Sequence, residues 1–150
     1  NCMSHLLLKD TFDNFSFIEG EITTFNKFTI SGFLQEDFFD EKPEETYSRW
    51  NKTRDFCFQI IRGKRTPLGF KIVLALPEDQ VPYFLTAHGL TGYRPEEIRG
   101  LYLNFHYDGH HLQCITGTSL NTFTMDKSIE REWDQEVKNI LKSRSIEGDY

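Results

Sequence analysis

The sequence predicts a single α+β domain over residues 1–150, with a largely antiparallel sheet and helices on one face. Three observations lead to this fold class. The chain has 150 residues, of which 38% are hydrophobic and 27% charged, a composition that suits one domain with one core. Helix-like and strand-like apolar patterns follow in the order helix, two strands, helix, strand, short helix, two strands, helix. Consecutive strands are joined by short turns, so we expect antiparallel hairpins.

The first half is expected to contain the end of a helix over residues 3–9 and two strands over residues 15–25 and 28–34, joined at Asn26-Lys27. A second helix is predicted to begin at Pro43, which suits the first helical position, and to end at Gly63, which suits a left-handed cap. Apolar residues at spacings of three and four support this helix. Its stripe consists of six residues, of which all but Arg54 are apolar: Tyr47, Trp50, Arg54, Cys57, Phe58 and Ile61.

The second half begins with an apolar run over residues 70–76, which predicts a central strand buried on both faces. Asp79 is expected to cap a short helix that Gly89 closes. Residues 101–107 and 110–116 predict a hairpin around a type I′ turn at Asp108-Gly109. Asp126 is expected to cap a final helix. The apolar stripe of that helix consists of Ile129, Trp133, Val137, Ile140 and Leu141.

The two halves also resemble each other. Residues 18–25 match residues 98–105 with Ile, Gly and Phe in register, and each hairpin precedes a helix that contains one of the two tryptophans, Trp50 and Trp133. We interpret this as two diverged helix-hairpin-helix repeats, over residues 1–63 and 70–143. The alternative is a chance similarity among common strand residues.

Charge and cysteine content restrict the classes of partner. The net charge of −6 disfavours nucleic acid and anionic membranes, which attract clustered Lys and Arg. The densest acidic stretch, residues 36–45, is interpreted as a solvated loop. No apolar run approaches the roughly 18–20 residues that span a bilayer. The three cysteines show no CxxC spacing, which favours reduced thiols and a cytoplasmic location.

His106 and His111 are candidate metal ligands. If Asp108-Gly109 forms a two-residue loop, these histidines lie directly opposite each other, with Cβ atoms about 4.5–5.5 Å apart. Two imidazoles at that distance suit a divalent metal, although zinc would need a third or fourth ligand. The alternatives are a solvated polar strand face and a pH-sensitive contact surface.

A second candidate is an anion site formed by Arg62, Lys64, Arg65 and Thr66. Three cations, a hydroxyl and free amides suit a phosphate or a carboxylate. The glycine spacing of a Walker loop is absent, and the segment follows the C-terminus of a predicted helix. The alternative is that these cations stabilise the negative end of the helix dipole.

Three segments carry a resemblance to a known family: HLLLKDTFDNF at residues 5–15, GKRTP at residues 63–67 and YLNF at residues 102–105. They resemble a family of short proteins from clostridia and related Firmicutes, classed as a domain of unknown function. The resemblance covers nearly the whole chain and implies a bacterial, cytoplasmic protein. It also implies that a short strand and half a helix precede Asn1. It brings no assigned activity and no catalytic residues.

The sequence contains no nucleophile elbow and no cofactor fingerprint, so we expect no cofactor and lean against catalysis. We predict a non-catalytic binding or assembly domain whose partner is another protein or a second copy of the chain. Edge strands offer pairing surfaces for a homodimer. The alternatives are a small metal-binding protein or enzyme that uses His106 and His111, and a phosphate-ligand binder that uses the 62–65 loop.

Overall fold

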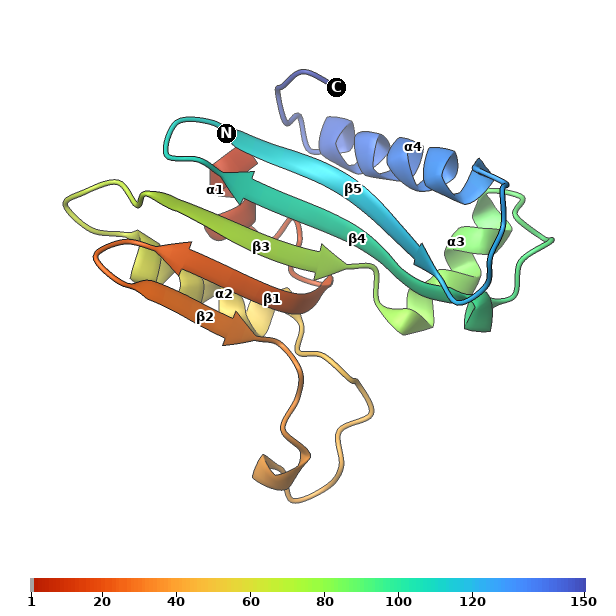
Figure 1. Cartoon of the computed structure of the whole chain (residues 1–150), viewed down its shortest axis with the longest axis horizontal. Helices are drawn as coiled ribbons and strands as arrows, with labels where there is room; N and C mark the ends of the chain where they lie inside the picture. The colour runs from red at the N-terminus through yellow and green to blue at the C-terminus, as the bar shows by residue number, and fades with distance from the viewer. Residues whose placement is uncertain (1) are drawn as a thin grey trace.

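The computed structural model describes residues 2–150 as a five-stranded sheet with four α-helices (Figure 1). The strand order is β2-β1-β3-β4-β5, and every neighbouring pair is antiparallel. The elements in chain order are α1 (Cys2–Leu7), β1 (Ser16–Thr23), β2 (Lys27–Ser31), α2 (Trp50–Ile61), β3 (Gly69–Ala75), α3 (Val81–Ala87), β4 (Ile98–Tyr107), β5 (Leu112–Leu120) and α4 (Ser128–Ser143).

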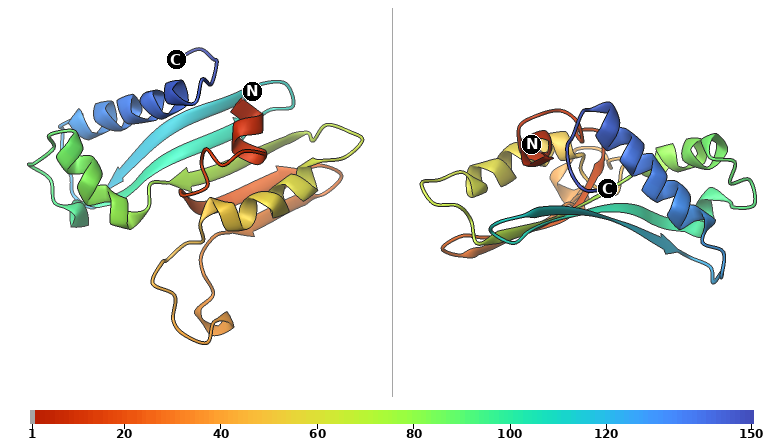
Figure 2. Two further views of the ribbon diagram at one scale, coloured as in Figure 1. Left: turned by 180° about the vertical axis from the view of Figure 1, so that it is seen from behind. Right: turned by 90° about the horizontal axis from the view of Figure 1, so that it is seen from above.

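All four helices lie on one face of the sheet, and the opposite face is open (Figure 2). The core fills the space between the helices and the sheet, where Phe17, Ile72 and Phe105 are fully buried. Antiparallel sheets tolerate this arrangement because alternate residues of each strand face water. The predicted α+β class, the antiparallel pairing and the placement of helices on one face are therefore confirmed.

The central strand β3 departs from its prediction. It lies between β1 and β4, but Lys71 is exposed and Val73 only half-buried. The expectation that β3 is buried on both faces is wrong, because no helix covers the side of the sheet to which Lys71 belongs (Figure 2). Its apolar run reflects a central position in one layer rather than a place between two layers of helices.

The second helix begins later than predicted. Residues 43–49 are not helical, and α2 begins at Trp50. Tyr47 instead forms a β-bridge with Phe33, which fixes the backbone before the helix in an extended conformation. Gly63 does not form a left-handed cap either. Among the described glycines, positive φ angles occur at Gly89 (68°) and Gly109 (97°).

The last two helices follow the predicted periodicity. Four of the five residues in the predicted stripe of α4 are buried, and Gly89 closes the turn after α3 as expected. Asp126 is not the N-cap residue of α4, which is Lys127. The Asp126 carboxylate instead accepts a hydrogen bond from the backbone N–H of Ser128 at 2.9 Å in the turn that leads into the helix. Asp79 does not cap α3. It lies in a single 3₁₀ turn, Glu78–Gln80, with its carboxylate 3.8 Å from Arg49.

An ionic clamp joins α3 to α4. His88 lies between two carboxylates, with Nδ1 2.9 Å from Glu132 Oε2 and Nε2 2.5 Å from Glu136 Oε2. A carboxylate only accepts, so both ring nitrogens donate and the bridging form is the imidazolium. Burial alone would lower the pKa of His88, but hydrogen bonds and charge from the two glutamates outweigh it, and the net pKa is raised.

We therefore expect the clamp to stabilise the fold at acidic and neutral pH. Because the folded-state pKa of His88 is raised, its contribution is complete below the unfolded pKa of about 6.5. It is lost as the pH rises through the folded-state value. The difference in unfolding free energy between wild type and His88→Gln, on the order of 1 kcal/mol, should shrink at alkaline pH. Urea unfolding at several pH values measures it, and a difference that grows with pH would contradict the clamp.

Candidate functional site

The two predicted metal ligands are not opposite each other. His106 pairs with Gln113 in the β4–β5 ladder, and the last pair before the turn is Tyr107 with Leu112. His111 therefore lies in a four-residue turn, and the predicted register is wrong by two residues. Within residues 2–150, no group of three His, Cys, Asp or Glu residues is arranged to hold a metal ion. The use of His106 and His111 as metal ligands stays a prediction.

The longer turn has a side-chain cause. The Asp108 carboxylate accepts backbone N–H groups from His110 at 2.8 Å and His111 at 2.7 Å. These hydrogen bonds hold the pKa of Asp108 below its usual range, and the bond from His111 has the largest effect. An Asp that binds two following amides forms a local turn of its own. The two residues that would have continued the ladder are therefore held in the turn.

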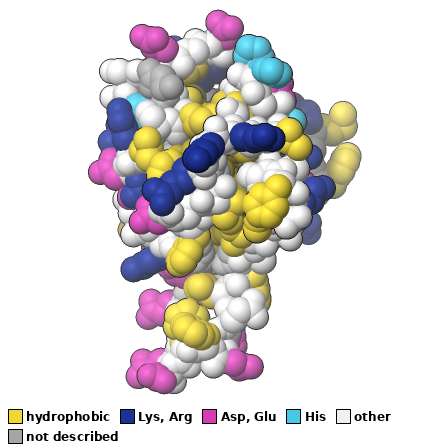
Figure 3. Space-filling view, turned by 90° about the vertical axis from the view of Figure 1, so that its left-hand side faces the viewer, with side chains coloured by type: hydrophobic (Ala, Val, Ile, Leu, Met, Phe, Trp, Pro, Cys, Tyr) yellow, Lys and Arg dark blue, Asp and Glu magenta, His cyan; other side chains and the backbone are white. Residues whose placement is uncertain are grey.

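The four predicted anion ligands lie together in the loop between α2 and β3. Arg62, Lys64, Arg65 and Thr66 are all exposed, and none of the three cations forms an ion pair with a residue of the described chain. Figure 3 shows Lys and Arg side chains gathered across this end of the molecule, with apolar side chains among them. The segment is free to bind an anion, and that role stays a prediction.

A projecting loop is the feature that sequence reasoning did not single out as a site. Residues 32–49 leave the sheet after β2, extend away from the body and return to α2 (Figure 1). We call this segment the projecting loop. Two β-bridges pin its base, Phe33 with Tyr47 and Ser16 with Arg49. The rings of Phe33 and Tyr47 also meet edge to face, with centroids 6.0 Å apart. The base is therefore rigidly attached to the sheet.

Arg49 fastens the returning arm of the loop to two other parts of the fold. Its guanidinium donates to Glu45 Oε1 at 2.7 Å and to the backbone oxygen of Asn14 at 2.6 Å. It also lies 3.8 Å from Asp79 in the turn before α3. One side chain thus ties the loop to the segment before β1 and to the segment after β3.

The tip of the loop presents two neighbouring phenylalanines to solvent. A 3₁₀ turn, Glu36–Phe38, forms the tip. The side chains of Phe38 and Phe39 are 84% and 42% exposed, and their rings meet edge to face at 5.5 Å. Acidic residues flank the pair in the sequence: Glu36, Asp37, Asp40 and Glu41. Paired exposed aromatics on a charged loop are a surface suited to a partner rather than to water.

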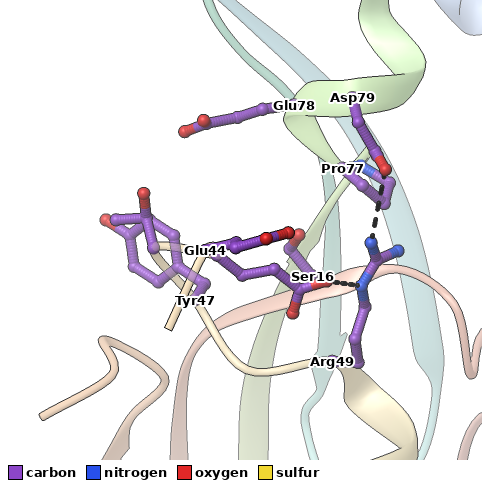
Figure 4. Close-up of a pocket in the computed structure, with 9 residues that line it drawn as sticks. Ser16, Glu44, Tyr47, Arg49, Pro77, Glu78 and Asp79 are labelled. Atoms are coloured by element: carbon purple, nitrogen blue, oxygen red, sulfur yellow. Dashed lines mark hydrogen bonds and ion pairs between the residues drawn. The ribbon is translucent and has the colours of Figure 1, made fainter. Parts of the chain in front are cut away.

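A cleft of about 280 Å³ lies at the base of the loop (Figure 4). Its lining combines the returning arm with the turn after β3 and consists of Ser16, Glu44, Glu45, Thr46, Tyr47, Arg49, Pro77, Glu78 and Asp79. Arg49 forms ion pairs with Glu45 and Asp79 and is the only cation among these lining residues. Neither histidine nor cysteine lines the cleft. Its carboxylates would attract cationic groups.

One feature of the sequence indicates the projecting loop. Residues 36–45 form the densest acidic stretch of the chain and had been interpreted as a solvated loop, which the structure confirms. The adjacent Phe38 and Phe39 inside that stretch were the missed part. Two adjacent phenylalanines in a chain with 14 of them do not by themselves indicate exposure, because aromatic side chains commonly pack in cores.

The described fold and these surfaces define a small α+β domain with a one-sided antiparallel sheet. Comparison of the chain with protein-family models gives a match to the family of unknown function DUF5721 over residues 5–149. The protein belongs to this family. No curated protein and no solved structure matches the chain. No helix within residues 2–150 has both the length and the apolar character needed to cross a membrane.

Proposed function

We propose that the protein is a non-catalytic binding and assembly domain, and that the projecting loop is its binding element. The observation that carries this proposal is the exposure of Phe38 and Phe39 at the tip of a loop whose base is pinned to the sheet. Burying one phenylalanine side chain stabilises an association by roughly 1.5–3 kcal/mol. Aromatic residues that project from a surface are also enriched among the residues that dominate binding energy.

Preorganisation of the loop supports the same role. An association loses less free energy when the binding segment is already ordered. The Phe33–Tyr47 bridge and the contacts of Arg49 fix the base without using any residue of the tip. Strand pairing is a weaker route to assembly. The edge strand β2 has only five residues, and α4 packs against the other edge strand, β5.

Two other functions remain as alternatives. One is a metal-binding protein or enzyme that uses His106 and His111. The other is a phosphate-ligand binder that uses Arg62, Lys64, Arg65 and Thr66. The second alternative is favoured by the absence of ion-pair partners for these cations within residues 2–150.

Site-specific photo-crosslinking tests the proposed function. A photoreactive phenylalanine analogue is placed at Phe38, and at Phe123 as a matched control with similar exposure, 90% against 84%. Illumination in the native cells should give covalent adducts from position 38 and few from position 123. Neither substitution should change the unfolding free energy by more than about 0.5 kcal/mol, because both sites are at the surface. Equal labelling at the two positions would contradict the proposal.

We also propose that the chain arose by duplication and works in the bacterial cytoplasm. Each half contains a hairpin flanked by helices: α1, β1, β2 and α2 in one, and α3, β4, β5 and α4 in the other. Trp50 and Trp133 are both fully buried, and each donates its indole N–H to a backbone carbonyl. Three free cysteines support a reducing compartment.

A further inference from the structure

The charge of the chain is unevenly distributed. Residues 36–45 contain six carboxylates and one lysine, a net charge of −5 out of −6 for the whole chain. The cations of the 62–65 loop lie at the opposite end of α2. Because α2 has 12 residues and rises 1.5 Å per residue, about 18 Å separates its two ends. The projecting loop extends away from that end (Figure 1), so the two charged segments do not neutralise each other within one molecule.

Apolar side chains accompany the cations. Phe25 in the β1–β2 turn is 87% exposed, and Leu68 after the cationic loop is 70% exposed. The two segments adjoin, because the N–H of Leu68 donates to the backbone oxygen of Thr23 at 2.9 Å. We call this surface, formed by Phe25, Arg62, Lys64, Arg65, Thr66 and Leu68, the basic end. Figure 3 views the molecule from this side, with the acidic loop projecting below it.

The basic end and the projecting loop are complementary in both charge and composition. Each presents two exposed apolar side chains, Phe25 with Leu68 on one and Phe38 with Phe39 on the other. The first pair adjoins unpaired cations, and the second adjoins an excess of carboxylates. Arg and Lys bind carboxylates through charge-assisted hydrogen bonds, while apolar groups beside them exclude water. A second copy of the chain therefore supplies the surface that each feature lacks.

We propose that the projecting loop of one molecule docks on the basic end of a second copy, head to tail. This inference rests on the proposed binding role of the loop and names its partner. Phe38 and Phe39 pack against Phe25 and Leu68. Loop carboxylates bind Arg62, Lys64 and Arg65, so the predicted anion site holds carboxylates of another chain.

The geometry of this contact sets how assembly behaves. Two different surfaces meet, so the contact is heterologous and repeats from molecule to molecule as a ring or an open chain. A single loop buries a small area, which places the interface in the weak class below about 1,200 Å². Exposed charges are screened within roughly 10 Å at 0.1 M salt, so association weakens as salt rises.

A pair of charge reversals tests the proposal. The basic-end variant is Lys64→Glu/Arg65→Glu, and the loop variant is Asp37→Lys/Asp40→Lys. Each variant alone removes most of the charge complementarity at the contact, because the loop segment changes from a net charge of −5 to −1 and the basic end from +3 to −1. Self-association should weaken at least about tenfold, or 1.4 kcal/mol. In an equimolar mixture the unaltered loop of the basic-end variant can dock on the unaltered basic end of the loop variant, so association should return. Sedimentation velocity over a dilution series measures all three samples, at low and at high salt.

Controls separate this proposal from general charge effects. Glu147→Lys/Asp149→Lys changes the net charge as the loop variant does, but at exposed positions near the C-terminus, and should associate like wild type. A wild type that stays monomeric at the highest concentration overturns the proposal, as does a mixture that fails to associate. If position 38 crosslinks only to a different protein, docking between copies is overturned. The proposed role of the loop as a binding element would then still stand. An adduct of twice the chain mass supports both the binding role of the loop and its docking on a second copy.

Discussion

Replacing Trp133 with alanine is expected to lower the free energy of unfolding by about 3–5 kcal/mol. The side chain is fully buried between α4 and the sheet. Its ring meets Phe84 edge to face at 5.6 Å, and its indole N–H donates to the backbone oxygen of Tyr102 at 3.0 Å. Alanine removes this packing, leaves a cavity and deprives a carbonyl of its hydrogen bond.

Thermal and urea unfolding measure the Trp133 effect. For a domain of this size, 1 kcal/mol shifts the midpoint by roughly 2–4 °C, so the fall should be on the order of 10 °C. Phe123→Ala is the matched control, since that ring is 90% exposed and its loss should cost less than about 0.5 kcal/mol. Trp133→Phe should lie between the two, because a ring remains but the donor is lost. Equal stability of Trp133→Ala and the control would contradict the packing of α4.

Periodicity predicted the elements whose stability depends on burial. The final helix was found from its apolar stripe, and Ile129, Trp133, Val137 and Leu141 are buried. Alternation along the strands also indicates which side chains of β4 face the helices. Leu103 and Phe105 are buried, and His106 lies on the open side. A shift of two residues preserves this alternation, so the wrong register did not change the predicted face.

Two local contacts, one made by a side chain and one by the backbone, account for elements that the sequence did not predict correctly. The Asp108-Gly109 pair predicts a two-residue loop. The Asp108 carboxylate instead accepts hydrogen bonds from the backbone N–H groups of His110 and His111, and the turn is longer. Residues 43–49 have a helix-like beginning, but the bridge between Tyr47 and Phe33 holds them extended. Both competing contacts depend on geometry that composition and spacing do not specify.

The candidate site was predicted only in part. The cations of the 62–65 loop and the acidic stretch 36–45 were both visible as charge clusters. Their complementarity could not be predicted from the sequence. It depends on the two segments lying at opposite ends of α2 and on the exposure of Phe38 and Phe25. An aromatic residue in sequence is more often buried than exposed, so exposure on this scale is found from the structure.

Gly32→Ala is expected to destabilise the fold and to release the base of the projecting loop. A methyl group at Gly32 would overlap the backbone carbonyl of Phe17, and backbone at this position cannot move aside freely. The N–H of Gly32 donates to Ile18 at 2.8 Å, and its carbonyl accepts from Ser48 at 2.9 Å. Forcing a methylene-sized group into a packed site costs roughly 1–3 kcal/mol and occasionally more, here with the loss of both hydrogen bonds.

Urea unfolding measures the global cost of Gly32→Ala, and hydrogen exchange at the amides of Leu34 and Ser48 measures release of the base. Both amides donate across the base, to Thr46 at 3.0 Å and to Gly32 at 2.9 Å, so they should exchange faster. Gly92→Ala is the control, since no atom lies within 4 Å of its added methyl group. If the loop binds through a preorganised tip, Gly32→Ala should also reduce crosslinking from position 38, although no tip residue is altered. Unchanged exchange would show that the base of the loop is not held by the close approach of Gly32 to Phe17.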